Sequence, residues 1–221
     1  MPPVITIDGP SGSGKGTISG CLAELLGWQV LDSGALYRLA AYAARKSGID
    51  FNNQSLVADN ARKMRVVFDQ GKVLLEDEDV SLSIRTEQAG NDASRVAAMP
   101  EVRAALLDWQ REAAVAPGLI ADGRDMGTTV FPQAPLKVFL TASAEERAKR
   151  RYKQLKEKGI ESNISDLAAE IQERDERDRT RSASPLVPAR DAVVIDSTAF
   201  SIKEVVDQVL QAARERGLVK A

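Results

Sequence analysis

The sequence predicts an α/β fold in which helices flank a five-stranded parallel sheet. Five short apolar runs, rich in valine, isoleucine and leucine, alternate with segments of helical spacing, and uninterrupted apolar runs are typical of strands buried on both faces. The runs are residues 4–7, 28–31, 119–121, 138–140 and 193–195. With 221 residues and 43% hydrophobic content, the chain is long enough to bury such a core as one domain with a subdomain.

The first strand is followed by a helix. The run Val4–Ile7 ends at Asp8, and the segment Lys15–Leu26 carries apolar residues at helical spacing until Gly27, a residue type that commonly stops helices. A strand, a short glycine-rich connection and a helix are therefore expected in this order.

Two later helices have recognisable starts. Ser143 with Glu146, and Ser201 with Glu204, match the capping box, in which serine and glutamate three residues apart satisfy otherwise unpaired N–H groups. The helix after Ser201 is expected to end at Gly217.

One segment departs from the alternation of parallel strands and helices. Between Met64 and Val80, the runs Val66–Phe68 and Val73–Leu75 flank the residues 69–72, which include a glycine. This pattern predicts a β-hairpin around a glycine turn, and hence a small antiparallel insert between helices.

Composition excludes several classes of site and partner. The chain has no histidine and one cysteine, Cys21, so it contains no internal disulfide and no four-cysteine zinc site, and any metal must be bound by oxygen. A net charge of −2 argues against nucleic-acid and acidic-membrane partners. The first residues lack the basic and apolar regions of a signal peptide, so a cytoplasmic location is expected.

The connection between the first strand and the first helix has the pattern G-x-x-x-x-G-K. In this position, glycines allow successive backbone N–H groups to surround an anion, the helix N-terminus adds partial positive charge, and a lysine reaches the outer phosphates. The predicted nucleotide-binding residues are Gly9, Pro10, Ser11, Gly12, Ser13, Gly14, Lys15, Gly16 and Thr17. The sequence therefore predicts a site for a nucleoside triphosphate.

This loop departs from the usual pattern where a hydroxyl contacts magnesium. Gly16 stands at that position, and Thr17 comes one residue later. Direct binding of Mg²⁺ by the loop is thus not expected; Asp122, at the end of the run 119–121, is the candidate to hold the ion through water. The simpler alternative for Asp122 is a turn residue at a strand end.

A phosphoryl acceptor that is itself a phosphate needs no general base, because its oxygen is already ionised, and this suits a chain without histidine. Catalysis then depends on neutralising several phosphates, for which arginine is suited. Two helical segments carry arginines on one face: Arg147, Arg150 and Arg151 in the first, and Arg174, Arg177 and Arg181, with Asp178, in the second. Solvated helix faces remain the alternative interpretation of these charges.

Three further stretches carry a family resemblance. The segments 31–38 (LDSGALYR), 122–128 (DGRDMGT) and 185–189 (PLVPA) resemble signatures of bacterial cytidylate kinases, and the resemblance extends over essentially the whole chain, hairpin insert included. It implies a P-loop NTPase fold of the nucleoside monophosphate kinase type. It also implies transfer of the γ-phosphoryl group of ATP, with Mg²⁺, to CMP or dCMP in pyrimidine nucleotide metabolism.

The resemblance also implies a domain organisation. A single kinase domain, residues 1–221, would comprise a core of residues 1–32, 107–144 and 182–221. A monophosphate-binding region with the β insert would occupy residues 33–106. The lid and the arginine-rich helices would occupy residues 145–181, of which Arg147–Gly159 would form a short mobile lid.

Residue roles follow from the same resemblance. Those implied as catalytic are Lys15, Arg124, Arg147 and Arg181. Arg38, Arg124 and Arg181 would hold the acceptor phosphate, with Ser33 lining the same pocket. Ser94, Arg103 and Asp125 would read the cytosine, and Arg174 and Asp178 would contact the sugar.

The chemistry of the base agrees with these assignments. Cytosine presents an exocyclic amine that the carboxylate of Asp125 could accept from, and acceptors that suit Arg103, whereas uracil would oppose Asp125 with a carbonyl. Leaving buried groups unpaired costs about 1 to 3 kcal/mol each, so CMP should be preferred to UMP. The alternatives are a helix or turn cap for Ser94, and an ion pair with Glu101 or Asp108 for Arg103.

Other functions remain possible from the sequence. A different small-molecule kinase would share the glycine loop, and a regulatory protein would bind ATP without transferring a phosphoryl group. A GTPase is disfavoured because the chain lacks the guanine-reading pattern Asn-Lys-x-Asp. On the kinase interpretation, the chain is expected to act as a monomer on CMP and dCMP, without nucleic-acid or membrane partners.

Overall fold

The computed structural model describes residues 2–69, 72–157, 159 and 161–219. The chain folds into two compact units. The first, here called the core unit, comprises residues 1–32 and 112–221, and the second, the insert unit, comprises residues 33–111.

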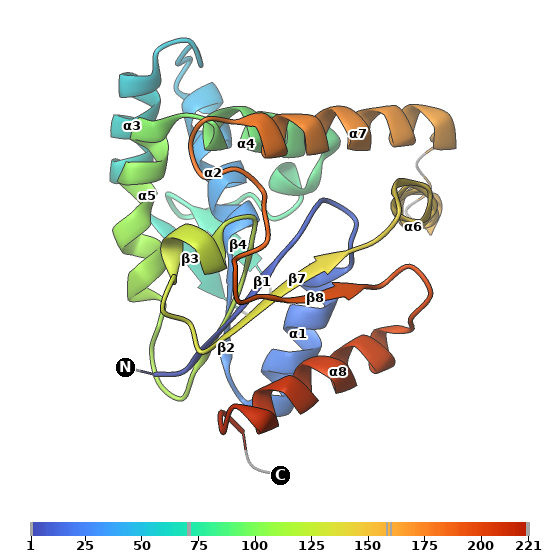
Figure 1. Cartoon of the computed structure of the whole chain (residues 1–221). Coiled ribbons are helices and arrows are strands. Elements are labelled where there is room, and N and C mark those ends of the chain that lie inside the picture. The colour runs from blue at the N-terminus through green and yellow to red at the C-terminus, as the bar shows by residue number, and fades with distance from the viewer. Residues whose placement is uncertain (1, 70–71, 158, 160, 220–221) are drawn as a thin grey trace. The chain divides into compact units, whose positions relative to one another are not determined.

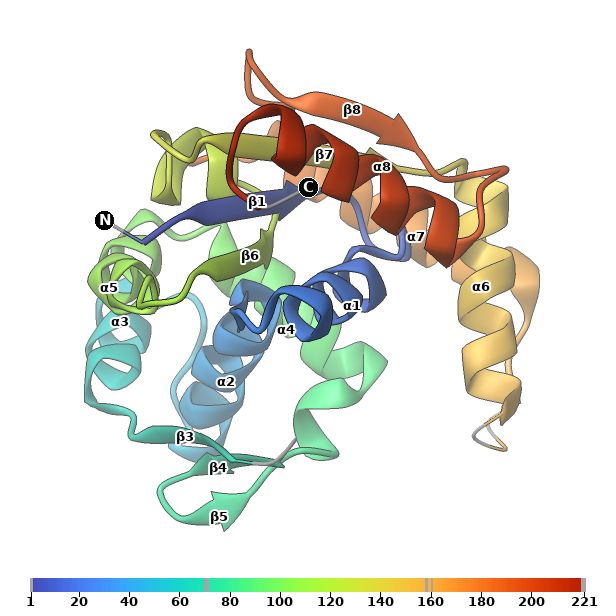
Figure 2. The same cartoon turned by 90° about the horizontal axis from the view of Figure 1, so that it is seen from below.

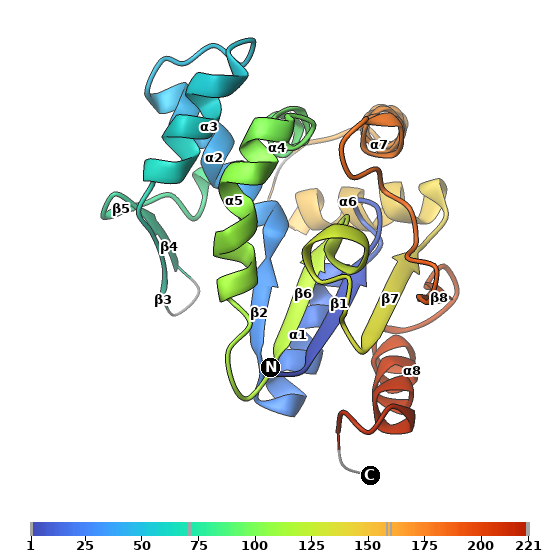
Figure 3. The ribbon, with the colours of Figure 1, turned by 60° about the vertical axis from the view of Figure 1, so that its left-hand side comes forward.

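The core unit contains a five-stranded, all-parallel sheet (Figure 1) with the strand order β2-β6-β1-β7-β8, which can be followed in Figure 3. The strands are β1 (Val4–Asp8), β2 (Gln29–Asp32), β6 (Leu119–Gly123), β7 (Leu136–Thr141) and β8 (Val193–Asp196). All residues of β1 and β6 are buried, because these two strands occupy the centre of the sheet. The predicted parallel sheet is confirmed, with each strand within a few residues of its apolar run.

Helices α1 (Lys15–Leu26) and α8 (Ile202–Glu215) cover one face of this sheet (Figure 2). Their apolar side chains, among them Leu22 and Val209, form one cluster with Ile5 and Ile120 of the central strands, and all four side chains are completely buried. The predicted bounds of α1 are confirmed: Gly27 ends the helix with a φ of 66°, which glycine adopts without steric cost.

The two predicted capping boxes have different outcomes. The box at Ser201 and Glu204 is complete, and α8 ends at Glu215, two residues before Gly217. At Ser143, only half of the box is present: the hydroxyl accepts from the Glu146 N–H at 3.2 Å, but the Ser143 N–H donates to Thr198 Oγ1 instead. The prediction of a full box was wrong because the Glu146 carboxylate accepts from the guanidinium of Arg150, at 2.9 Å.

The insert unit consists of four helices and a small antiparallel sheet (Figure 3). The helices are α2 (Ser33–Lys46), α3 (Gln54–Lys63), α4 (Glu87–Ala97) and α5 (Pro100–Glu112), with a 3-10 turn at Ser83–Arg85. Strands β3 (Val66–Asp69) and β4 (Lys72–Leu75) confirm the hairpin. Of the predicted turn at residues 69–72, residues 70–71 lie outside the described residues. A third strand, β5 (Glu78–Asp79), was not predicted; the positive φ angles of Glu76 and Asp77 turn the chain back to form it.

Two long helices of the core unit, α6 (Ala144–Glu157) and α7 (Ile164–Thr180), pack against each other beyond the carboxyl ends of the strands (Figure 1). In open α/β sheets, this edge is where ligands bind. None of the helices in the described part of the chain combines the length and the apolarity needed to cross a membrane.

Candidate active site

The glycine loop joins β1 to α1 at the carboxyl edge of the sheet. Gly12 and Gly14 have φ angles of 76° and 93°, in the left-handed region that side chains disfavour. No side chain caps the N-terminus of α1, and its first turn carries no acidic residue. The end of the helix dipole is thus available to an anion.

The loop is held from outside by contacts to its carbonyl oxygens. Arg147 donates to Ser11 O at 3.0 Å, while Ser197 Oγ and Arg150 donate to Ser13 O at 3.0 and 3.3 Å. Arg147 is 5% exposed and also pairs with Asp175 at 2.5 Å. In this structure, Arg147 and Arg150 thus support the loop from α6, as residues of the predicted arginine-bearing face, whereas Ser197 was missed by the sequence analysis.

Lys15 lies beside Asp122, with Nζ 3.8 Å from Oδ1 and side-chain exposures of 13% and 9%. Burial, followed by repulsion from Arg124, lowers the pKa of Lys15 to about 8. Burial raises the pKa of Asp122 to about 6, against the opposing attraction of Lys15. A Cβ at Gly16 would lie 3.4 Å from Asp122 Oδ2, so Asp122 faces the position where a loop hydroxyl is usual.

A second group of charged residues connects the turn after β6 with the end of α7. Arg124 Nε donates to Asp178 Oδ2 at 3.0 Å, and Arg181 NH2 lies 3.8 Å from Asp125 Oδ1. Asp125, Asp178 and Arg181 are 2%, 3% and 8% exposed. Arg174, one turn before Asp178 on α7, is close enough to lower the pKa of Lys15. The structure therefore brings these predicted residues together, whereas Arg151 and Arg177 pair along their own helices, with Gln154 and Glu173.

The predicted residues of the insert unit lie on three helices. Ser33, the first residue of α2, and Ser94, on α4, are both 3% exposed. Arg38 NH1 donates to Ile84 O at 2.9 Å. Arg103, on α5, donates to Ala97 O at 3.1 Å, and its guanidinium lies 5.6 Å from the centre of the Tyr37 ring. Within this unit, the side chain of Arg103 thus connects α5 with α2 and α4.

A buried carboxylate at the end of β1 was not singled out from the sequence. Asp8 Oδ1 and Oδ2 accept from the backbone N–H groups of Met126 and Gly127, each at 2.8 Å. Burial raises the pKa of Asp8 to about 7, although both backbone hydrogen bonds lower it. The sequence signal was present, since an aspartate directly before a phosphate loop ends a buried strand.

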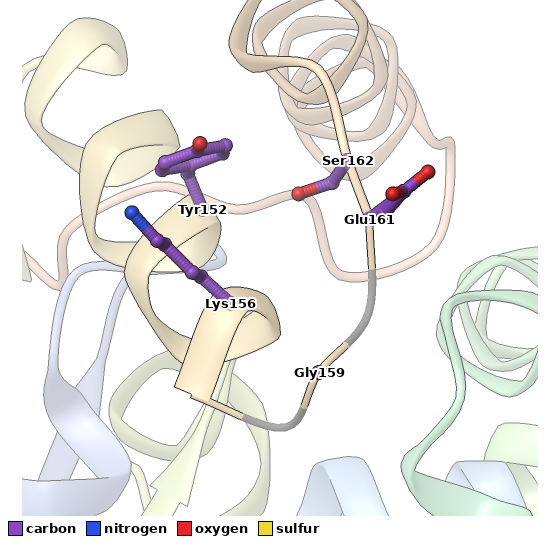
Figure 4. A pocket seen from close by; sticks show the side chains of 5 residues that line it. All are labelled: Tyr152, Lys156, Gly159, Glu161 and Ser162. Carbon is purple, nitrogen blue, oxygen red and sulfur yellow. The ribbon is translucent and has the colours of Figure 1, made fainter.

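A cavity of about 450 Å³ lies where α6 leads toward α7 (Figure 4). It is lined by Tyr152, Lys156, Gly159, Glu161 and Ser162. Tyr152 and Lys156 are one turn apart on α6, within the segment that the sequence analysis assigns to the lid. None of the predicted catalytic residues lines this cavity.

The chain is similar to cytidylate kinases over nearly its full length. The model of the cytidylate kinase family matches residues 5–215. The chain belongs to this family. It is 56% identical over 225 aligned residues to the cytidylate kinase of Pseudomonas putida, covering 99% of both chains. It is 55% identical to that of Stutzerimonas stutzeri, covering 98% of this chain and 97% of that protein. Membership confirms the family resemblance and the assignment to nucleoside monophosphate kinases.

Among solved structures, an uncharacterised protein from Eubacterium ventriosum shares the fold. It has a TM-score of 0.53 and 10% sequence identity, and the alignment covers 97% of this chain and 99% of that protein. At this identity the likeness concerns the fold alone, which is the α/β architecture expected of a kinase in this family.

Proposed function

We propose that the chain transfers the γ-phosphoryl group of ATP to CMP or dCMP, giving ADP and CDP or dCDP. The observation that carries this proposal is the convergence of cationic side chains in the core unit. Arg124 and Arg174 lie close enough to Lys15 to lower its pKa by repulsion. Cations held close together against their mutual repulsion are suited to binding several phosphates, and family membership supports the choice of nucleotide.

The loop residues Gly9–Thr17 bind the donor phosphates. Backbone N–H groups at the start of α1 and the ammonium group of Lys15 stabilise the negative charge of the transferred group. Bound Mg²⁺ would supply further neutralisation of this charge. The residues fit such an ion, because the buried carboxylate of Asp122 faces Gly16 and supplies an oxygen of the kind that Mg²⁺ prefers.

The acceptor phosphate needs orientation and charge neutralisation, and no proton has to be removed from it. Arg38, Arg124 and Arg181 bind this phosphate in the proposed mechanism, and Ser33 lines the same pocket. Asp178 positions Arg124 through the hydrogen bond at 3.0 Å. Arg147 contributes to catalysis through the loop that it supports at Ser11.

The base is read by Asp125, Ser94 and Arg103, and the sugar is contacted by Arg174 and Asp178. Asp125 is 2% exposed, so an opposing carbonyl group of uracil would meet an acceptor that water cannot reach. Closure of α6, as a lid over the phosphates, would exclude water from the transfer. We further propose that the enzyme acts as a cytoplasmic monomer on free nucleotides, with no nucleic-acid or membrane partner.

The proposal is tested by measuring diphosphate formation from CMP, dCMP, UMP, AMP and shikimate with Mg²⁺ and ATP. CMP and dCMP should be the preferred acceptors. Preference for another acceptor would identify a different kinase, and ATP binding without any product would indicate a regulatory protein.

The variant Lys15→Ala should lower kcat/KM at least about 100-fold, because a charge-assisted contact to the transferred group is lost. Lys203→Ala, which removes a lysine that is 86% exposed on α8, is the control and should behave as wild type. Near-normal turnover by Lys15→Ala would contradict the role assigned to Lys15.

A further inference from the structure

Asp8 is the last residue of β1, and its carboxylate is buried. It is 4% exposed, and each of its two oxygens accepts one backbone N–H, from Met126 and from Gly127, at 2.8 Å. Its strand partner in the register is Gly123, the last residue of β6. Asp8 therefore connects the strand that leads into the phosphate loop with the turn that follows β6.

This turn is a tight one and carries the predicted acceptor-binding residues Arg124 and Asp125. Its π-helical segment, Met126–Val130, is closed by backbone bonds from Thr129 and Val130 to Asp125 O and by one from Phe131 to Met126 O, at 2.7 to 3.2 Å. The two N–H groups that Asp8 binds come directly after Asp125. They therefore determine the direction in which the backbone leaves that residue, which has a φ of −150° and a ψ of 24°.

The side chains around Gly127 leave the turn little space to adopt another position. A Cβ at Gly127 would lie 2.9 Å from Thr6 Oγ1, 3.2 Å from Lys137 Cδ and 3.3 Å from Asp8 Oδ2. The backbone at Gly127 is thus packed closely against the side chains of Thr6, Lys137 and Asp8. Because the turn is closely packed, a substitution at Asp8 will consequently shift the whole turn.

Apart from its hydrogen bonds to Met126 and Gly127, the buried position of Asp8 is unfavourable for a charged carboxylate. Burial raises the pKa of its carboxyl group, and the negative charges of Asp125 and Asp122 raise it further. Lys137, the cation packed against the same turn, donates to Asp191 at 2.9 Å. An apolar side chain would fill this position without the cost of desolvating a charge. The contribution of the carboxylate is therefore its hydrogen bonds to the two N–H groups.

We infer that Asp8 is a positioning residue for binding of the acceptor nucleotide. Its two hydrogen bonds fix the turn that carries Arg124 and Asp125. This inference rests on the proposed function, because it assigns base reading to Asp125. Displacement of a binding group by about 1 Å is enough to lower a rate about 100-fold. Asp8 should therefore affect the choice and the binding of the acceptor more than the binding of ATP.

The decisive variant is Asp8→Asn, which keeps the shape but places an amide NH₂ against one of the two backbone N–H groups. We expect the KM for CMP to rise about tenfold, and the ratio of kcat/KM for CMP over UMP to fall about tenfold, with the KM for ATP changing less than about threefold. Asp191→Asn is the matched control. It removes an acidic group, 65% exposed, that also lies near this turn through Lys137, and all three quantities should stay at the wild-type values.

A second variant changes the turn instead of Asp8. Gly127→Ala keeps the Asp8 carboxylate but places a methyl group 2.9 Å from Thr6 Oγ1 and 3.3 Å from Asp8 Oδ2, so it should displace the same turn and give the same signature: a raised KM for CMP and a lowered CMP-to-UMP ratio. It decides the question if Asp8→Asn does not fold, as judged by near-UV circular dichroism.

Two outcomes would overturn the inference. If the folded variants raise the KM for ATP and leave the acceptor ratio unchanged, Asp8 serves the phosphate loop; if only the unfolding midpoint moves, its role is structural. Failure of the proposed function would look different, because the wild type itself would then prefer another acceptor. The same ratio, measured for that acceptor over CMP, would still decide the role of Asp8.

Discussion

Removal of the Asp122 charge should lower the pKa of Lys15. The two groups lie 3.8 Å apart, and the pKa values of about 8 for Lys15 and about 6 for Asp122 mean that both are charged between pH 6 and 8. Lys15 must be protonated to attract phosphates. Its charge is lost as the pH rises through about 8, and in Asp122→Asn this loss should begin at a lower pH.

The size of the effect follows from the distance. At an effective dielectric constant of about 20, two unit charges 3.8 Å apart attract by about 4 kcal/mol, which corresponds to about three pKa units. The side chains are 13% and 9% exposed, so water reduces this value to some extent. We therefore expect the pKa of Lys15 to fall by roughly one to three units in Asp122→Asn.

The pKa is measured by NMR titration of the Lys15 side chain in protein free of nucleotide and metal, with Lys15→Arg used for the assignment. The control is Asp207→Asn, which removes the carboxylate that raises the pKa of Lys203 on α8 and should leave Lys15 unaffected. A matching shift is expected in the alkaline limb of kcat/KM for ATP. An unchanged pKa of Lys15 in Asp122→Asn would refute the electrostatic reasoning.

Three further variants test the base site and the fold. Asp125→Ala should lower the kcat/KM ratio of CMP over UMP at least about tenfold, because the acceptor for the exocyclic amine is lost; an unchanged ratio would remove Asp125 from base reading. Gly118→Ala would place its Cβ 2.4 Å from Trp28 Cδ2, so the free energy of unfolding in urea should fall by about 1 to 3 kcal/mol, and an unaltered midpoint would contradict this packing. Ser201→Ala, which breaks the capping box of α8, should cost about 1 kcal/mol in the same assay without changing kcat; wild-type stability would show that the cap contributes nothing.

Much of the fold could be predicted from local sequence. The bounds of α1 were correct because apolar spacing, the preceding glycines and Gly27 act within one or two helical turns. The glycine loop was found because phosphate binding by backbone N–H groups requires specific residues at fixed spacing. The third strand of the insert was missed, because β5 has two residues and depends on backbone reversal at Glu76 and Asp77.

The sequence by itself thus determined the five strands of the parallel sheet, the hairpin, the first helix and the phosphate loop, whose causes lie among neighbouring residues. The tertiary structure alone decided which charges meet. Asp8 binds N–H groups 118 and 119 residues away, and Ser197 Oγ holds a carbonyl 184 residues away. Contacts with Thr198 and Arg150 replace one of the two predicted hydrogen bonds of the capping box at Ser143. Such partners leave no periodic pattern in the chain, because the parallel sheet brings them together by aligning the carboxyl ends of strands that are distant in sequence.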